Sequence, residues 1–124
     1  MKTIIAGSRS ILGYDVVKGF IDSLDLEITE VVSGTAKGVD TLGEQYAKEY
    51  NIPIKRFPAD WNKYGNAAGP IRNEQMIDYV GEEGQVIIIW DGISRGTLST
   101  IRLAKAKNIP LYIKVIKEYT CTIS

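Results

Sequence analysis

The chain of 124 residues is 44% apolar and 24% charged, and its 15 Lys and Arg residues balance its 15 Asp and Glu residues. This composition predicts one ordinary globular domain over residues 1–124, large enough to bury a core. The absence of net charge argues against nucleic acid, or any other polyanion, as the main partner. Histidine is absent, which removes the commonest general base and the commonest metal ligand.

Cysteine usage and hydropathy set the expected compartment. Cys121 is the single cysteine, which excludes an internal disulfide. The sequence has no signal peptide and no apolar run of membrane length. We therefore expect a cytoplasmic protein with no membrane partner, no metal site and no resident cofactor.

Apolar runs of strand length alternate with apolar residues at helical spacing along the chain. The predicted strands cover residues 2–6, 28–32, 54–57, 85–90 and 111–115. The predicted helices cover residues 16–24, 39–51, 70–80 and 98–108. Asp15 is the expected N-cap of the first helix, Pro70 opens the third helix and Gly81 ends it. Residues 59–69 are predicted to form the longest loop, and the polar tail from Lys117 is assigned no element.

This alternation predicts an α/β fold with three α/β/α layers and a mainly parallel, five-stranded sheet. Right-handed crossovers favour the strand order 3-2-1-4-5. The short, polar run 54–57 then lies at a sheet edge, and the most apolar run, 85–90, lies near the centre. Ligands of such sheets bind beyond the carboxyl ends of the strands, at the switch point between the first and fourth strands.

Three glycine-containing turns converge at that switch point, over residues 7–13, 33–38 and 91–97. The second turn leads into a helix start, where unpaired N–H groups and the helix dipole favour a phosphate. Arg72 is expected to pair with phosphate oxygens, and Arg9 either does the same or is a solvated loop charge. The backbone and hydroxyl groups expected at the phosphate belong to Gly7, Ser8, Gly34, Thr35, Gly96 and Thr97.

Aromatic and acidic side chains near the same rim are further candidates. Trp61 and Tyr64, in the predicted loop, either stack on a base or pin the loop to the domain. Asp40 is interpreted as structural, because a negative charge in the first turn of a helix favours the dipole. The acidic residues available for a catalytic role are Asp60, Glu74 and Asp91.

Several motifs, in this order, resemble the SLOG superfamily of DprA-like and Lonely Guy-like proteins, and most closely its small YspA-type, cpYpsA-related branch. The matching segments are Ala6–Arg9 with Asp15, Ser33–Asp40 with Ala47, Asp60-Trp61 with Gly65, Ala68–Asn73 with Met76, and Ser94 with Gly96-Thr97. Segment 33–40 also looks like the DprA signature, with Glu44 where a histidine is usual. The resemblance implies a Rossmann-like sheet that binds a nucleotide or nucleotide-derived ligand. It extends the predicted ligand contacts to Ser33, Ala36, Lys37, Gly38, Asp60, Trp61, Asn73 and Ser94. Asp91, an acidic residue near the rim, is also predicted to contact the ligand.

The resemblance also bears on catalysis. Lonely Guy enzymes hydrolyse the N-glycosidic bond of nucleoside monophosphates, and their arginine motif resembles Arg72-Asn73 with Met76. Their Gly-Thr turn resembles residues 92–97, but the glutamate in the helix after it is missing here, because residues 98–101 are Leu-Ser-Thr-Ile. Glycoside hydrolysis needs a carboxylate near the reacting carbon or its attacking water. That carboxylate would have to come from the three acidic candidates.

Three hypotheses follow, in order of preference. The first is a non-catalytic binder that senses or sequesters a nucleotide-type signal, since other SLOG domains sense signals such as ADP-ribose-type molecules. The second is an N-glycosidase or phosphoribohydrolase acting on nucleotides. The third is a DprA-like binder of single-stranded DNA, against which the balanced charge argues. SLOG relatives are commonly dimers, so we expect a homodimer or a higher homo-oligomer.

Overall fold

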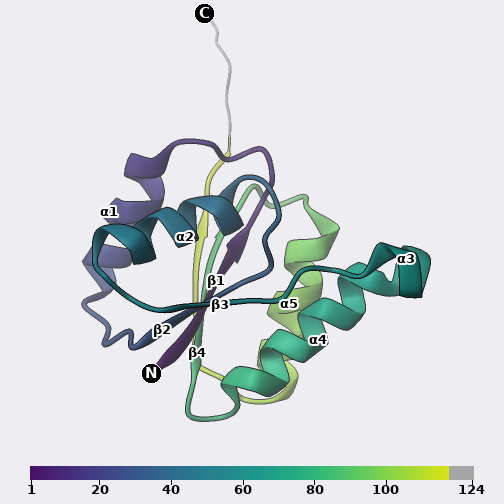
Figure 1. Ribbon diagram of the computed structural model, residues 1–124. Coiled ribbons are helices and arrows are strands. Elements are labelled where there is room, and N and C mark those ends of the chain that lie inside the picture. Colours follow the sequence, from purple (N-terminus) through teal and green to yellow (C-terminus); the bar gives the residue numbers. More distant parts are fainter. Residues whose placement is uncertain (118–124) are drawn as a thin grey trace, which may run out of the picture.

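The computed structural model describes residues 1–117, which fold around a five-stranded sheet (Figure 1). The strands are β1 (Lys2–Gly7), β2 (Glu30–Ser33), β3 (Ile54–Arg56), β4 (Gln85–Trp90) and β5 (Leu111–Val115). They lie in the order β3-β2-β1-β4-β5, and every neighbouring pair is parallel. The predicted α/β class and strand order are confirmed.

Helices cover both faces of the sheet and complete three layers (Figure 1). On one face lie α1 (Tyr14–Leu24) and α2 (Val39–Glu49), and on the other lie α4 (Ala68–Val80) and α5 (Arg95–Ala106). Neighbouring strand residues point to opposite faces, so Ile4 joins the core beneath α4 and α5, whereas Ile5 joins the core beneath α1 and α2. The β4 residues Val86–Ile89 are fully buried, because this central strand is covered on both sides.

The prediction that residues 59–69 form a loop is wrong. This segment contains a short helix, α3 (Trp61–Tyr64), followed by one 3₁₀ turn, η1 (Gly65–Ala67). The side chain of Asp60 starts α3 by accepting a hydrogen bond from the backbone N–H of Lys63 (3.1 Å). Helix α4 then begins at Ala68, so Pro70 is its third residue rather than its first. Pro70 still falls in the first turn, where the N–H that proline lacks would have no helical partner.

Asp15 is not the N-cap of α1, which is a second correction. Gly13 occupies the cap position without a side-chain hydrogen bond, and Asp15 lies in the first turn, where its charge still favours the helix dipole. The sequence predicts no element for the tail from Lys117. Residues 118–124 of that tail, which include Cys121, lie outside the described residues. None of the helices within residues 1–117 is both long and apolar enough to cross a membrane.

Ser8 holds the carboxyl ends of the central strands together at one rim. Its N–H donates to the carbonyl of Ile89 in β4 (3.1 Å), and its carbonyl accepts from the N–H of Val39 at the start of α2 (3.3 Å). Its hydroxyl oxygen accepts from the N–H of Asp91, directly after β4 (2.9 Å). Because Ser8 is fully buried, water does not compete for these bonds, and the three glycine-containing turns are fixed side by side.

Gly7 lies where β1 passes closest to β4, which leads to a stability prediction. A Cβ at this position would lie 1.9 Å from the carbonyl oxygen of Ile89 and 2.8 Å from Cγ2 of Val39. The carbonyl cannot move without disturbing the sheet. We expect Gly7→Ala to lower the free energy of unfolding by at least about 3 kcal/mol, the upper end for overpacking.

Gly96→Ala is the matched control, measured in the same urea titration. Nothing lies within 4 Å of a Cβ at Gly96, in the first turn of α5. Alanine is the better helix former, so this variant should be unchanged or more stable by up to about 1 kcal/mol. Equal stability of the two variants would contradict the close approach of β1 and β4.

Candidate functional site

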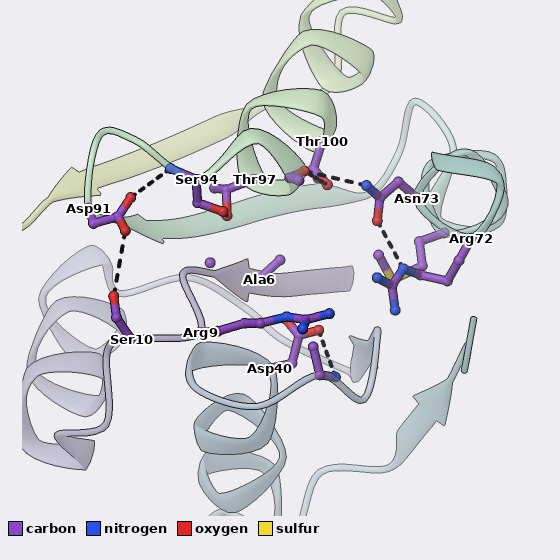
Figure 2. A pocket seen from close by; sticks show the side chains of 14 residues that line it. Ala6, Arg9, Ser10, Asp40, Arg72, Asn73, Asp91, Ser94, Thr97 and Thr100 are labelled. Atoms are coloured by element: carbon purple, nitrogen blue, oxygen red, sulfur yellow. Dashed lines mark hydrogen bonds between the residues drawn. The ribbon is translucent and has the colours of Figure 1, made fainter. Parts of the chain in front are cut away.

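A cavity of about 420 Å³ opens at the rim where β1 and β4 end and α2 and α5 begin (Figure 2). Helix α4 contributes its third wall. The predicted ligand contacts that line this cavity are Gly7, Arg9, Ala36, Arg72, Asn73, Asp91, Ser94, Gly96 and Thr97. The structure thus brings residues from all three predicted turns, and from α4, around one space.

Two smaller hollows adjoin this cavity on the side of Arg72. One, of about 300 Å³, is lined by the predicted contacts Gly34, Thr35, Lys37 and Trp61, together with Arg9, Ala36 and Arg72. The other, of about 280 Å³, is lined by Asp60 and Tyr64 among others. Trp61 and Asp60 therefore lie beside the main cavity and not in it.

Three predicted contacts lie outside these hollows because they are buried. Ser8 joins the turns, as described above, and Gly38 packs against the backbone of Ser8 and Arg9. The hydroxyl of Ser33 donates to Glu44 (2.7 Å) and accepts from the N–H of Thr35 (3.0 Å). These residues shape the rim from beneath it.

The turn before α2 already holds an anion, the carboxylate of Asp40. The N–H of Ala36 donates to Oδ2 of Asp40 (3.1 Å), and the N–H of Thr35 donates to the hydroxyl of Ser33. Asp40 is buried in the first turn of α2. A phosphate at this turn would have to displace these contacts, so the predicted phosphate site at residues 33–38 stays a prediction that the local hydrogen bonds disfavour.

The first amide groups at the start of α5 also have no acceptor among residues 1–117. Asp91 closes the turn before the helix, where its Oδ1 accepts from the N–H groups of Ile93 and Ser94 (2.8 Å each). The N–H groups of the next residues, 95–97, donate to no acceptor among residues 1–117. Gly96 and Thr97 line the cavity, so this helix start presents its unpaired donors and positive dipole end to the space.

Two arginines flank Asp40 in the cavity. Figure 2 shows the side chain of Arg9 extended over Asp40 toward Arg72. The guanidinium of Arg72 donates to Oδ1 of Asn73 (2.9 Å) and to the carbonyl of Gly34. Arg9, by contrast, is exposed. The cavity therefore holds both cations at the end near Asp40, while the carboxylate of Asp91 lines its other end (Figure 2). An added anion is favoured beside the arginines and disfavoured beside Asp91.

Burial decides the ionisation of Asp40. Burial raises the pKa of this carboxyl from 3.8 to about 6, while the N–H of Ala36 and the charges of Arg72 and Arg9 lower the pKa. Burial also lowers the pKa of the Arg72 guanidinium. Sequence reasoning missed Asp40 as a residue of the site, along with Ser10 and Thr100, which also line the cavity.

The three acidic candidates have different positions. Asp91 lines the cavity, and the N–H groups of Ser94 and Ile93 lower its pKa, so it stays ionised and holds the turn. Asp60 caps α3, and Glu74 is exposed on α4 outside these hollows. Within residues 1–117, His, Cys, Asp and Glu side chains do not gather in any group of three or more that could hold a metal ion.

The pKa of Asp40 predicts how stability changes with pH. Between the unfolded value of 3.8 and the folded value of about 6, the folded protein binds more protons than the unfolded chain. Stability therefore falls as the pH rises through this window. Asp40→Asn keeps an oxygen for the N–H of Ala36 and removes the unfavourable free energy of burying a charged carboxylate. We expect the variant to gain about 2–3 kcal/mol over the wild type between about pH 4 and pH 7 in urea unfolding. A constant difference over that range would contradict the raised pKa.

Comparison with known proteins gives a family. A model of the YspA, cpYpsA-related SLOG family (YAcAr) matches residues 1–64. No curated protein and no solved structure was found to match. The matched half contains the turns at Gly7–Ser10 and Ser33–Gly38, whereas Arg72 and the start of α5 lie beyond it. Family membership fits a nucleotide-related function in general terms. The chain belongs to the YspA, cpYpsA-related SLOG family.

Proposed function

We propose that this protein binds a nucleotide-type ligand at the rim without hydrolysing it, as a sensor or a sequestering protein. One observation carries the proposal. The unpaired N–H groups at the start of α5 open into a cavity that also holds Arg9 and Arg72. A phosphate there would receive backbone hydrogen bonds, the favourable end of a helix dipole and two positive charges.

The carboxylate of Asp40 favours a phosphate at the start of α5 over one in the turn before α2. The two helix starts face the same space, but Asp40 already accepts from the N–H of Ala36 in the turn before α2. At α5, the amides that Asp91 binds are those of Ile93 and Ser94, which leaves the amides of Gly96 and Thr97 open. The buried Asp40 carboxylate in the turn before α2 would repel a phosphate there, which favours the start of α5.

The arrangement supports binding over hydrolysis. A general acid or base must be free to move a proton at the reacting atoms. Asp91 is held ionised by two backbone N–H groups. Neither Asp60 nor Glu74 lines the cavity. The hollow beside Lys37 and Trp61 offers room for a second half of the ligand, as in an ADP-ribose-like molecule.

Asp40 favours a second candidate function, an N-glycosidase. Its carboxyl lies in the cavity, and burial raises its pKa to about 6, the range in which a carboxylic acid serves as a general acid. In this reading Asp40 would protonate the departing base. The contact with the N–H of Ala36 and the nearby arginines hold the carboxyl in place, which counts against that role.

Arg9→Ala tests the binding site with the least disturbance of the fold, because Arg9 is exposed. We expect its affinity for AMP or ADP-ribose to fall by about 1.5–3 kcal/mol in titration calorimetry, the scale of a hydrogen bond to a charged group. Arg102→Ala, at an exposed arginine of α5 outside the cavity, is the matched control and should bind normally. Unchanged affinity in Arg9→Ala would remove this residue from the site.

Turnover separates the two candidate functions. After prolonged incubation with nucleoside monophosphates or ADP-ribose, we expect chromatography to recover each ligand intact, because Asp40 and Asp91, the carboxyl groups that line the cavity, are both held by backbone N–H groups. Free base and ribose phosphate in proportion to protein would support the glycosidase instead. Asp40→Asn, Asp91→Asn, Asp60→Asn and Glu74→Gln would then identify the carboxylate by loss of activity.

A further inference from the structure

A larger, apolar hollow of about 720 Å³ lies beyond the end of the cavity that is remote from Arg72. Ile11, Leu12 and Val16 form one side of it, and Ile93 forms another. Leu12 and Ile93 are 73% and 82% exposed. Large apolar side chains that are this exposed on two adjacent loops lose unfavourable contact with water when an apolar group covers them.

Ser10 and Asp91 connect this hollow to the cavity, because both residues line both spaces. The hydroxyl of Ser10 donates to Oδ2 of Asp91 at 3.5 Å, which is the outer limit for such a bond. Figure 2 shows this pair at one end of the cavity, with Arg72 and Asn73 at the other. A ligand held by its phosphate near the arginines can therefore extend past Ser10 and Asp91 into the apolar hollow.

The carboxylate of Asp91 offers a suitable contact at this junction. Its Oδ1 is used by two backbone N–H groups, whereas its Oδ2 accepts the long bond from Ser10. The pKa of Asp91 is lowered by these N–H groups, so Oδ2 carries negative charge in the usual pH range. Such an oxygen accepts hydrogen bonds from hydroxyl groups of a sugar.

We propose that the apolar hollow takes the nucleobase of the ligand, with the ribose passing over Ser10 and Asp91. This inference rests on the proposed function, since the phosphate near Arg9 and Arg72 sets the direction of the ligand. The alternative platform is Trp61, on the opposite side of the arginines. Trp61 is 53% exposed on the short helix α3, so its ring could contact a base on one face only. The apolar hollow would surround a base with side chains from α1 and from both loops.

The test compares ligands with and without a base by titration calorimetry. The probes are ribose 5-phosphate and the monophosphates AMP, GMP, CMP and UMP. We expect at least one monophosphate to bind about tenfold or more tightly than ribose 5-phosphate, the scale of one base contact. Leu12→Ser and Ile93→Ser should reduce that affinity to near the value for ribose 5-phosphate and leave ribose 5-phosphate binding unchanged. Both positions are exposed, so the fold should tolerate the substitutions.

Trp61→Ala is the competing variant and should bind all the probes normally. Weaker monophosphate binding in Trp61→Ala, with normal binding in Leu12→Ser and Ile93→Ser, would place the base on the tryptophan and overturn the inference. Equal affinity for ribose 5-phosphate and for every monophosphate would also overturn it, while the phosphate site would stand. If no probe bound at all, the proposed function itself would fail.

Discussion

Ser8 is the residue on which the geometry of the rim depends. Its N–H, carbonyl and hydroxyl join β1 to Ile89 in β4, to Val39 at the start of α2 and to Asp91 before α5. Ser8 is fully buried, so losing one of these bonds would leave one of its polar groups unpaired away from water. The close approach also requires glycine at neighbouring positions, because a Cβ on Gly7 or Gly38 would collide with the backbone. Ser8, a predicted ligand contact, thus positions the groups that face the cavity.

The two helix starts that Ser8 brings together differ in the carboxylate beside them. In the turn before α2, the buried carboxylate of Asp40 accepts from the N–H of Ala36. The start of α5 keeps its donors open, because Asp91 closes only the turn before it. Arg9 and Arg72 lie together at one end of the cavity and Asp91 lies at the other (Figure 2), so an anion from outside is favoured beside the arginines. Phosphate binding through fixed donors and charges would need no proton transfer, which fits the proposed binding role.

The fold could be predicted from the sequence because parallel sheets follow topological rules that need only the order of strands and helices. By contrast, the side chains that meet at the rim are determined by contacts between the layers of the fold. No local pattern indicates that Arg72 of α4 reaches the carbonyl of Gly34 across the rim. Asp40 did have a local signal: it shares the buried face of α2 with Gly43 and Ala47, at helical spacing. A carboxylate on a buried face must find partners inside the protein, so it could have been assigned to the site.

A crystal structure of the protein with a bound nucleoside monophosphate would test the central claim most directly. The account predicts phosphate oxygens within hydrogen-bond distance of the N–H groups of Gly96 and Thr97, with the guanidinium groups of Arg9 and Arg72 alongside, and an intact glycosidic bond. A phosphate bound at the opposite rim, in the hollow formed by Met1, Lys2 and residues 80–83, would contradict it. So would a phosphate that displaces Asp40 from the N–H of Ala36 and leaves the start of α5 empty.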